Sequence, residues 1–335
     1  MTARMVMALV GLGPAALPHL RSLHDLMDRI EFRYACARRP DADRVRPYPG
    51  PVQMTDSLDL ILQDPEVQAV IVATPPATHL DICQRCFAAG KHVLLEKPLE
   101  VNFERSARLV EMAEAAGLRL GLVLQHRYRE ASLALEKIMR EGRLGEVQAA
   151  SVRIPWWRSQ AYYNEPGRGT MARDGGGVLL TQAIHTLDLF RSLVGVKSVK
   201  SAVVRQTKLH QMETEDYVSA LLVLGNGAPG DLMATTAMFS GFSETIEIMG
   251  ALGSARLSGA NLEVHFLEGS PVNVRSEGGT GSGANIMDFS HEPHRALLTE
   301  FMNAIKENRE PKVNGRDALA TQTLIVELLR VGASK

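Results

Sequence analysis

Two short clusters of ionisable residues in this sequence could carry redox and proton-transfer chemistry. The first is Glu96-Lys97-Pro98, which places a carboxylate and an ammonium directly after the apolar run Val93-Leu94-Leu95. The second contains His185, which follows the glycine triplet at 175–177. An imidazole titrates near neutral pH and can take a hydroxyl proton, and an ammonium can stabilise a developing alkoxide. Lys97 and His185 are therefore the candidate catalytic residues, and they suit oxidation of a secondary alcohol or its reverse.

A dinucleotide-binding pattern lies near the N-terminus. Gly11-Leu12-Gly13-Pro14-Ala15-Ala16 fits G-x-G-x-x-[G/A], follows the apolar run at 5–10 and opens a predicted helix. In that context the first glycine permits a tight turn, and the second lets a pyrophosphate approach the helix N-terminus. Pro14 lacks an N–H, which is tolerated in a first helical turn. We expect Gly11, Leu12, Gly13, Pro14 and Ala15 to bind a dinucleotide.

The end of the second predicted strand indicates which nicotinamide cofactor is bound. Enzymes that use NAD commonly carry an acid there, which binds the ribose 2′-hydroxyl. This sequence instead has Arg38 and Arg39 after Tyr34-Ala35-Cys36-Ala37. A guanidinium can hold a 2′-phosphate through charge-assisted, bidentate hydrogen bonds. We therefore expect NADP, with NAD as the alternative if both arginines are solvated surface residues.

Three further places are expected to line the cofactor site. Thr74 and Pro75 follow the third predicted strand, at the carboxyl edge where open α/β sheets bind ligands. His79 begins the next helix and either joins this groove or serves only as a helix-start residue. Gln125 follows the last strand of the same domain, and Glu96 and Lys97 complete the set.

The segment 156–170 is the richest candidate for contact with a substrate. It holds both tryptophans of the chain, and aromatic faces suit the C–H surface of a sugar ring. Its arginines suit a carboxylate or phosphate, so a polyhydroxylated, acidic substrate is one hypothesis. The alternative is a loop that packs on a neighbouring subunit. The expected substrate-binding residues are Arg127, Trp157, Arg158, Tyr163, Arg168, Asp174, Thr181 and His185.

The order of predicted elements indicates an α/β protein of two domains. Strands and helices alternate up to residue 124, which predicts an N-terminal Rossmann domain with a doubly wound parallel sheet. From residue 125 to 335, strands at 147–154, 198–206, 216–224 and 230–239 predict an α+β domain with a large, mainly antiparallel open sheet. Gly278–Gly283 is predicted to be a loop, and helices at 292–308 and 316–332 close the chain.

Composition and charge exclude several classes of function. The chain has 335 residues and a net charge of −1, so we expect no nucleic-acid or membrane partner. No apolar run reaches the ~18 residues of a membrane span, and the N-terminus enters a strand at once, so we expect no signal peptide and a cytoplasmic protein. Cys83 and Cys86 are expected as partly buried thiols on a helix surface. His291 and His294 flank a proline and lack further ligands, so we expect no metal.

Several of these features together resemble the Gfo/Idh/MocA oxidoreductases, over nearly the whole chain. They are Gly11-Leu12-Gly13 with His19, the Thr74-Pro75 turn, Glu96-Lys97-Pro98, the stretch from Gly175 to Asp188 and the closing segment 301–318. The resemblance implies a Rossmann domain plus a sheet domain. It implies that Lys97 touches the reacting oxygen, Glu96 the nicotinamide ribose, and that His185 faces the substrate. It also implies a homodimer or homotetramer formed through the sheet of the second domain.

One position departs from the usual pattern of that family. Many members carry an acid four residues before the histidine, where this sequence has Thr181. A threonine hydroxyl can orient a substrate oxygen but is no base near neutral pH, so proton transfer falls to His185 and Lys97. Asp188, three residues after His185, either orients the imidazole or pairs on its own helix.

The expected function is that of an NAD(P)-dependent oxidoreductase acting on a small molecule. It transfers a hydride between nicotinamide and a sugar, cyclitol or related hydroxy compound. Two alternatives stay open: a glycosidase that holds NAD and oxidises its substrate transiently, and a non-catalytic protein that binds NADP as a sensor.

Overall fold

The structure, a computed structural model, describes residues 4–276 and 289–333 and forms two compact units. Unit 1 contains the chain up to Gln125 together with His291–Leu319, and unit 2 contains His126–Ser290 together with the chain from Ala320. The sequence analysis assigned everything after residue 124 to the second domain, whereas residues 291–319 pack with unit 1. The predicted loop Gly278–Gly283 lies outside the described residues.

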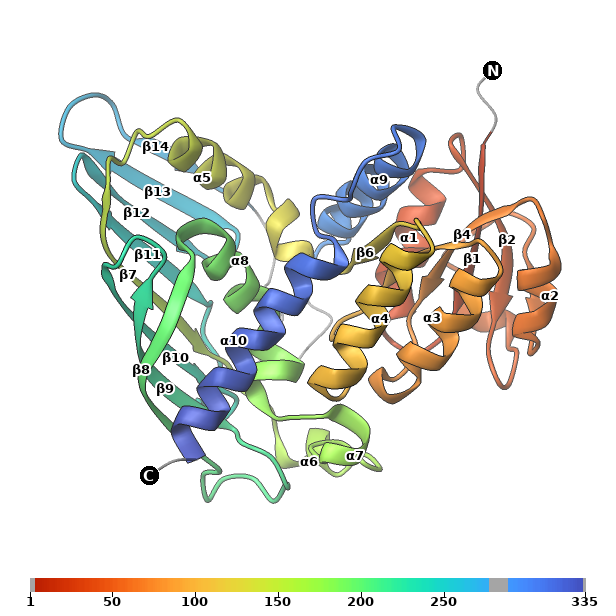
Figure 1. Ribbon diagram of the computed structural model, residues 1–335, viewed down its shortest axis with the longest axis horizontal. Coiled ribbons are helices and arrows are strands. Elements are labelled where there is room, and N and C mark those ends of the chain that lie inside the picture. Colours follow the sequence, from red (N-terminus) through yellow and green to blue (C-terminus); the bar gives the residue numbers. More distant parts are fainter. Residues whose placement is uncertain (1–3, 277–288, 334–335) are drawn as a thin grey trace. The chain divides into compact units, whose positions relative to one another are not determined.

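Unit 1 is built on a six-stranded parallel sheet (Figure 1). Its strands are β1 Met5–Val10, β2 Ile30–Cys36, β3 Gln53–Thr55, β4 Val67–Val72, β5 His92–Leu95 and β6 Leu120–Leu122. Their order is β3-β2-β1-β4-β5-β6, and every neighbouring pair is parallel, which confirms the predicted Rossmann sheet. β1 is buried along its whole length, as a central strand between two helical layers requires. The short strand β3 was not predicted.

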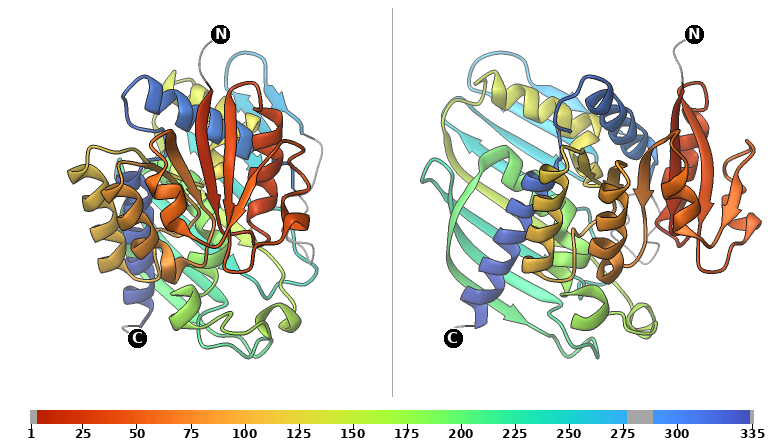
Figure 2. Two further views of the ribbon diagram at one scale, coloured as in Figure 1. Left: turned by 90° about the vertical axis from the view of Figure 1, so that its right-hand side faces the viewer. Right: turned by 45° about the vertical axis from the view of Figure 1, so that its right-hand side comes forward.

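Helices cover both faces of this sheet (Figure 2). They are α1 Ala16–Asp25, α2 Leu58–Gln63, α3 His79–Ala88, α4 Phe103–Ala115 and α9 Glu292–Lys306, with short turns η1 Ala42–Val45 and η2 Pro76–Thr78. α1 packs against α9, and α3 packs against α4. Because all six strands run the same way, the turns that follow β1, β4 and β5 meet at one edge of the sheet.

Unit 2 is built on an eight-stranded sheet. Its strands are β7 Val147–Pro155, β8 Val196–Arg205, β9 Tyr217–Leu224, β10 Pro229–Thr235, β11 Thr245–Gly250, β12 Gly253–Ser258, β13 Asn261–Phe266 and β14 Val272–Val274. The order is β14-β13-β12-β11-β7-β10-β9-β8, and only the β7–β10 pair is parallel. This confirms the predicted mainly antiparallel sheet. β10 ends at Thr235, earlier than the predicted strand at 230–239. Beyond Thr235 the chain leaves the ladder, and Met238 N donates to the carbonyl of Trp156, the residue directly after β7.

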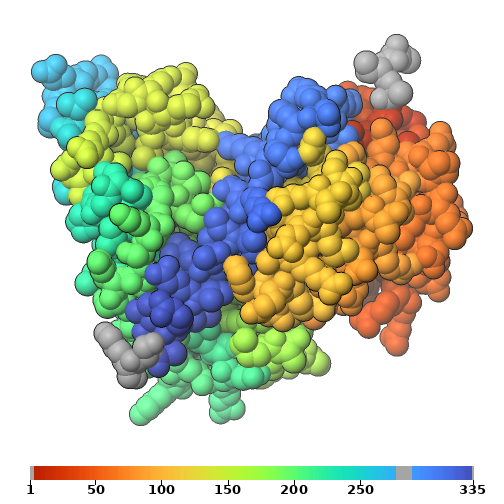
Figure 3. Space-filling view, viewed as in Figure 1, coloured from red at the N-terminus to blue at the C-terminus, as the bar shows by residue number. Residues whose placement is uncertain are grey.

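Helices lie on one face of this second sheet (Figure 1). The helical elements are η3 Gln125–Tyr128, α5 Glu130–Arg140, α6 Gln160–Tyr163, α7 Met171–Asp174, the π turn η4 Leu179–Ala183, α8 Ile184–Val194 and α10 Gly315–Ala333. α8 packs on β7, and α5 packs on β12 to β14. Along β9, Leu222 is buried and Leu221 is 59% exposed, so the opposite face is open. The outer side chains of α5 form part of the molecular surface (Figure 3). Within the described ranges, no helix combines the length and apolar character needed to span a bilayer.

Candidate active site

The glycine turn between β1 and α1 has the geometry that a dinucleotide requires. Gly11 has a φ of 99°, and a Cβ there would lie 2.4 Å from the carbonyl oxygen of Ala73, so only glycine fits. The Gly11 N–H donates to the carbonyl of Cys36 at 2.9 Å, which ties the turn to the end of β2. A Cβ on Gly13 would meet no atom within 4 Å, so the backbone is open to an approaching phosphate. The residues present therefore fit a pyrophosphate at the start of α1.

An additional arginine lies against this turn. Arg44 of η1 donates from Nη1 to the carbonyl of Leu12 at 3.2 Å. Arg38 and Arg39, the two arginines singled out in the sequence, are exposed directly after β2. Arg44 was not foreseen, because no local pattern distinguishes it from the other charged residues of its loop. Its guanidinium brings a cationic group to the dinucleotide turn.

Gln125 carries an oxygen that suits a ligand. Its Oε1 is buried, and none of the described residues forms a hydrogen bond with it. A buried amide oxygen without a donor costs free energy, so a donor from a bound molecule would be favoured there. Contact between Gln125 and the cofactor stays a prediction, and the buried Oε1 is an acceptor that such a contact could use.

Glu96 is buried after β5 and is held by a histidine of α1. Nε2 of His19 donates to Oε1 of Glu96 at 2.8 Å, and the ring of His294 from α9 meets the His19 ring edge-on, with 5.4 Å between centroids. Burial alone would raise the pKa of Glu96, but the hydrogen bond from His19 and the charges of His19, His294 and Lys97 bring it below its usual value. Glu96 is therefore ionised at neutral pH and fixed in direction.

Lys97 follows in the same turn and is half-buried. Its backbone N–H donates to Oε2 of Glu96 at 3.2 Å, and the Lys97–Pro98 peptide bond is cis. The turn after β4 is closed by Thr78, whose hydroxyl donates to the carbonyl of Pro75 at 2.8 Å and can accept from the Thr74 hydroxyl, also at 2.8 Å. Thr74 and Pro75 therefore form a compact turn at the sheet edge where the cofactor is expected.

His79 begins α3, in keeping with the helix-start alternative for this residue. The side chain has no exposed surface. Its ring nitrogens lie within hydrogen-bonding distance of the backbone carbonyls of Thr74, Pro98 and Leu99. His79 therefore supports the two turns that contain these carbonyls.

His185 lies near the start of α8, directly after the π turn Leu179–Ala183. Such turns are frequent at functional sites. Gly177 permits the approach of this segment to its neighbour, since a Cβ there would lie 1.9 Å from the carbonyl oxygen of Glu215. The Glu215 carboxylate also accepts from the N–H groups of Gly177 and Leu179, at 3.0 and 3.2 Å. The glycine triplet thus marks the helix start that positions His185.

Thr181 lies inside the π turn. Its hydroxyl donates to the carbonyl of Gly177 at 2.7 Å, so its proton is used within the helix. The oxygen retains acceptor capacity. Orientation of a substrate donor by Thr181 stays a prediction.

His126 is a functional candidate that the sequence analysis missed. Its ring lies 5.1 Å from that of His185, between centroids. Nε2 of His126 accepts from Arg129 at 2.6 Å, so Nδ1 carries the proton and donates to Oγ1 of Thr186 at 3.3 Å. Arg129 in turn pairs with Glu244 at 2.6 Å. The polar run Gln125-His126-Arg127-Tyr128 after the last strand of unit 1 could have indicated His126 from the sequence. Only its neighbours Gln125 and Arg127 were predicted as site residues.

Arg127 and Asp188 form a buried pair. The guanidinium of Arg127 bonds both carboxylate oxygens of Asp188, at 2.6 and 2.8 Å, and both side chains are buried. Thr321 of α10 donates to the same carboxylate at 2.7 Å. Asp188 also lies 3.7 Å from Arg191 on its own helix, which is one of its two predicted alternatives. Contact of Arg127 with a substrate stays a prediction.

The aromatic segment after β7 contains a polar network. Arg158 donates from Nε to Oε1 of Gln182 at 3.0 Å, and Gln182 donates from Nε2 to the hydroxyl of Tyr162 at 2.8 Å. Arg168 donates to the same hydroxyl at 2.7 Å, and its guanidinium carbon lies 4.2 Å from the centre of the Tyr162 ring. Two cationic groups, a phenol and an amide are thus assembled in one part of unit 2.

The other predicted substrate residues of this region divide into two groups. Trp157 is half-buried, with its ring 5.4 Å from the ring of Phe239, so part of it can meet a ligand. Tyr163 is buried, with its hydroxyl 2.7 Å from Oγ1 of Thr236, and is a structural residue. Asp174 is buried and accepts the N–H of Gly169 at 2.7 Å.

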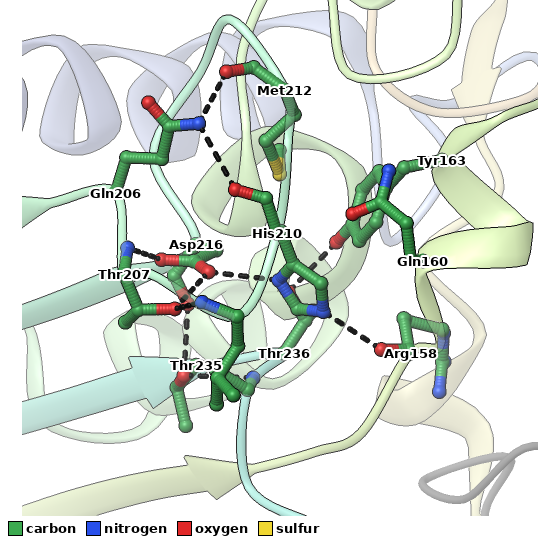
Figure 4. Close-up of polar contacts among 12 residues, drawn as sticks. Arg158, Gln160, Tyr163, Gln206, Thr207, His210, Met212, Asp216, Thr235 and Thr236 are labelled. Carbon is green, nitrogen blue, oxygen red and sulfur yellow. Dashed lines mark hydrogen bonds and ion pairs between the residues drawn. The ribbon is translucent and has the colours of Figure 1, made fainter.

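A buried ion pair anchors this segment from behind (Figure 4). Nδ1 of His210 donates to Oδ2 of Asp216 at 2.8 Å, and Nε2 donates to the backbone carbonyl of Arg158 at 2.8 Å. Asp216 also accepts from the N–H and hydroxyl of Thr207, at 2.6 Å each. Burial alone would lower the pKa of His210, but these acceptors raise it above its usual value. His210 was not foreseen, because its acceptors come from other elements.

Two family models match this chain. Residues 5–123 match an oxidoreductase family with an NAD-binding Rossmann fold, and residues 132–256 match the GFO/IDH/MocA C-terminal domain. An uncharacterized oxidoreductase of Schizosaccharomyces pombe is 30% identical over 261 residues, which are 74% of this chain and 69% of that protein. The chain belongs to the GFO/IDH/MocA oxidoreductase family. The predicted family and the need for a nicotinamide cofactor are thereby confirmed.

Proteins with named activities are also similar to this family member. Myo-inositol 2-dehydrogenase of Thermotoga maritima is 24% identical over 321 residues, 93% of this chain and 92% of that protein. The crystal structure of the WlbA dehydrogenase from Bordetella pertussis in complex with NADH and UDP-GlcNAcA is 26% identical, with a TM-score of 0.84 over 99% of this chain and 97% of that chain. The similarity therefore extends across both units.

Proposed function

We propose that this GFO/IDH/MocA family member transfers a hydride between NAD(P) and a secondary alcohol or ketone of a sugar, cyclitol or related hydroxy compound. The observation that carries the proposal is the turn after β5, where ionised Glu96 and the Lys97 ammonium stand at the ligand-binding edge of a parallel sheet. The activities named for the inositol dehydrogenase and for WlbA support the class of substrate.

The proposed roles follow from the chemistry of each group. A bound nicotinamide supplies the hydride donor or acceptor. Lys97 stabilises negative charge on the reacting oxygen, and His185 exchanges the hydroxyl proton with it. Glu96, held by His19, accepts hydrogen bonds from ribose hydroxyls. Gln125 offers its buried Oε1 to a donor of the cofactor.

Substitution of the two catalytic candidates tests this proposal. We expect Lys97→Met and His185→Ala each to lower kcat by about 10²- to 10⁴-fold, because each removes a charge-stabilising or proton-transferring group. Cofactor affinity, measured by fluorescence titration, should change little. Lys137→Met is the matched control. Lys137 is exposed on α5, and its partner Glu141 lies 3.9 Å away in a long ion pair at the surface.

Three outcomes would contradict the proposal. Full activity of Lys97→Met would remove its catalytic role. Binding of NADP by the wild type without turnover across a panel of sugars, cyclitols and ketones would indicate a sensor. Release of a cleaved sugar without net cofactor reduction would indicate a glycosidase.

The preference for NADP is a separate proposal. Arg38 and Arg39 are exposed after β2, and Arg44 is bound to the glycine turn, so all three can meet a 2′-phosphate. We expect Arg38→Ala, Arg39→Ala and Arg44→Ala each to weaken NADPH binding by about tenfold or more, the usual worth of a charge-assisted hydrogen bond. Binding of NADH should be nearly unaffected.

Isothermal titration with both cofactors measures this ratio. Arg46→Ala is the control, since Arg46 lies in the same loop but pairs with Asp43 at 2.8 Å. Equal losses for NADPH and NADH in all three variants would reject the arginine assignment.

We further propose that the substrate carries an anionic group. Arg158 and Arg168, linked through Tyr162 and Gln182, bring two cationic groups to the aromatic segment. Guanidinium groups recognise carboxylates and phosphates in bidentate geometry. A substrate screen should therefore compare the turnover of each neutral sugar with that of the corresponding sugar acid, and we expect the acid to be the better substrate.

We propose also that copies of this chain associate through the open face of the second sheet. Leu221 is 59% exposed and Met249 is 55% exposed on that face. Exposed apolar side chains on a sheet face are favourable sites for association.

A further inference from the structure

We propose that His79 is a positioning residue that fixes two turns of unit 1 against each other and thereby holds Lys97 in place. The first is the β4 turn, residues 74–78, and the second is the β5 turn, residues 96–101. The inference rests on the proposed function only where it treats Lys97 as catalytic. His79 begins α3, directly after the β4 turn.

One imidazole ring reaches both turns. Nε2 of His79 lies 2.9 Å from the carbonyl oxygen of Thr74 in the β4 turn. Nδ1 lies 3.0 Å from the carbonyl oxygen of Pro98 and 3.2 Å from that of Leu99 in the β5 turn. Carbonyl oxygens only accept hydrogen bonds, so each contact is a bond whenever the nitrogen carries a proton. The ring therefore lies between the connections that leave two adjacent strands of the sheet. In its neutral form it donates to one turn and contacts the other, and only the protonated ring donates to both.

Burial makes this bridge hard to replace. The His79 side chain has no exposed surface, so bulk water does not compete for these contacts in the folded protein. Burial lowers the pKa of His79 below its usual value, and this effect outweighs the opposing effects of the three carbonyls and the nearby Glu100. Glu100 itself accepts the N–H of Val101 at 2.6 Å and that of Leu80 at 3.4 Å, which joins the same β5 turn to α3.

Lys97 is thus restrained from both sides along the chain. On one side, Glu96 is held by His19 of α1 at 2.8 Å. On the other side, the carbonyl of Pro98 is held by His79. The residues on either side of Lys97 are thus each contacted by a buried imidazole. A small displacement of a catalytic group can lower a rate by orders of magnitude, so this restraint bears on the reaction.

Hydrogen exchange tests the bridge without substrate or cofactor. We expect His79→Phe, which fills the space without nitrogens, to raise the exchange rates of the Thr78, Lys97 and Val101 amides by about tenfold or more. The amide of His79→Gln can donate to one carbonyl, so this variant should restore protection from exchange in one of the two turns. If His79→Phe does not fold, His79→Gln replaces it in the experiment. His92→Phe is the matched control. His92 lies at the opposite end of β5, where its Nδ1 accepts from the Arg119 N–H at 2.9 Å.

Unchanged exchange in either turn of His79→Phe, or equal exchange in the His92 control, would overturn the proposal. Hydrogen exchange needs no turnover. An inactive wild type would therefore contradict the proposed function, while the exchange rates would still test whether His79 holds the two turns.

A double-mutant cycle tests the link to Lys97. We expect His79→Phe to lower kcat by about tenfold or more in the wild type and to cause no further loss in the Lys97→Met background. A merely structural role would lower residual activity by the same factor in both backgrounds. That additive result would reject positioning through Lys97.

Discussion

Buried charges at the candidate site are each matched by a group from another element. Glu96, after β5, is matched by His19 of α1, and Asp188 of α8 is matched by Arg127 and Thr321. A buried charge without such a partner would shift its pKa until it became neutral. These pairs therefore fix both the charge and the direction of side chains on the elements that carry Lys97 and His185.

Two adjacent glycines provide a test at the scale of single residues. A Cβ on Gly177 would lie 1.9 Å from the backbone oxygen of Glu215, whereas a Cβ on Gly176 would meet its nearest atom, Cβ of Leu180, at 3.2 Å. We expect Gly177→Ala to lower the free energy of unfolding by about 2 kcal/mol or more, since backbone must move. Gly176→Ala should cost less than about 1 kcal/mol, because a shift of only a few tenths of an ångström would relieve its nearest contact.

Urea denaturation of both variants measures the difference. Equal midpoints for the two would mean that the approach of Gly177 to Glu215 does not restrict the residue at this position.

Loops that carry function are anchored here by elements that are distant in sequence. The aromatic segment 156–170 is held at Arg158 by His210, which is itself paired with Asp216. The π turn before α8 is held by the carboxylate of Glu215, one residue before Asp216. One short stretch between β8 and β9 therefore supports both the candidate substrate segment and the helix of His185.

The His210–Asp216 pair gives the anchor a pH dependence. The folded-state pKa of His210 is raised, so its stabilising contribution is fully present below the unfolded pKa and is lost as pH rises through the folded pKa. Asp216, the Arg158 carbonyl and the rings of Trp157 and Tyr163 face the imidazole. We expect His210→Gln to lower the denaturation midpoint more at pH 6 than at pH 9.

The cost at pH 6 should be on the order of 1–3 kcal/mol, as for a buried hydrogen-bonded group that loses its partner. His265→Gln, an exposed histidine of β13, is the control. A difference between wild type and His210→Gln that stays constant across this range would contradict the raised pKa.

Each unit is organised around its own sheet, and the two sheets differ in how they are covered. The parallel sheet of unit 1 has helices on both faces, whereas the sheet of unit 2 has helices on one face only. Its open face carries charge pairs, such as Arg256 with Glu247 at 3.3 Å, around exposed Leu221 and Met249. This mixture of apolar and paired polar groups suits contact with a second copy.

A charge placed on that face tests association of the whole molecule. We expect Leu221→Glu to weaken self-association by at least about tenfold, because burial of an unpaired carboxylate is costly. Analytical ultracentrifugation measures the constant. Leu133→Glu on α5, 40% exposed outside the sheet, should leave it unchanged. A wild type that is monomeric at all concentrations would reject the proposed association.

Patterns local in sequence predicted much of the fold and part of the site. The glycine turn, the strand before Glu96 and the alternation of strands and helices each depend on neighbouring residues, and the apolar run Val93-Leu94-Leu95 lies within β5. The contacts of Arg127, His79 and His126 were not predicted. In each case the partner lies in another element, as with Asp188 for Arg127 and Pro98 for His79.

The sequence by itself determined the Rossmann sheet, the antiparallel sheet and the family, because strand periodicity, glycine spacing and short motifs are properties of contiguous residues. The tertiary structure alone decided which charges pair, which histidines are buried, and that residues 291–319 pack with unit 1. Those outcomes depend on desolvation and on hydrogen bonds between segments far apart in the chain, which no local pattern encodes.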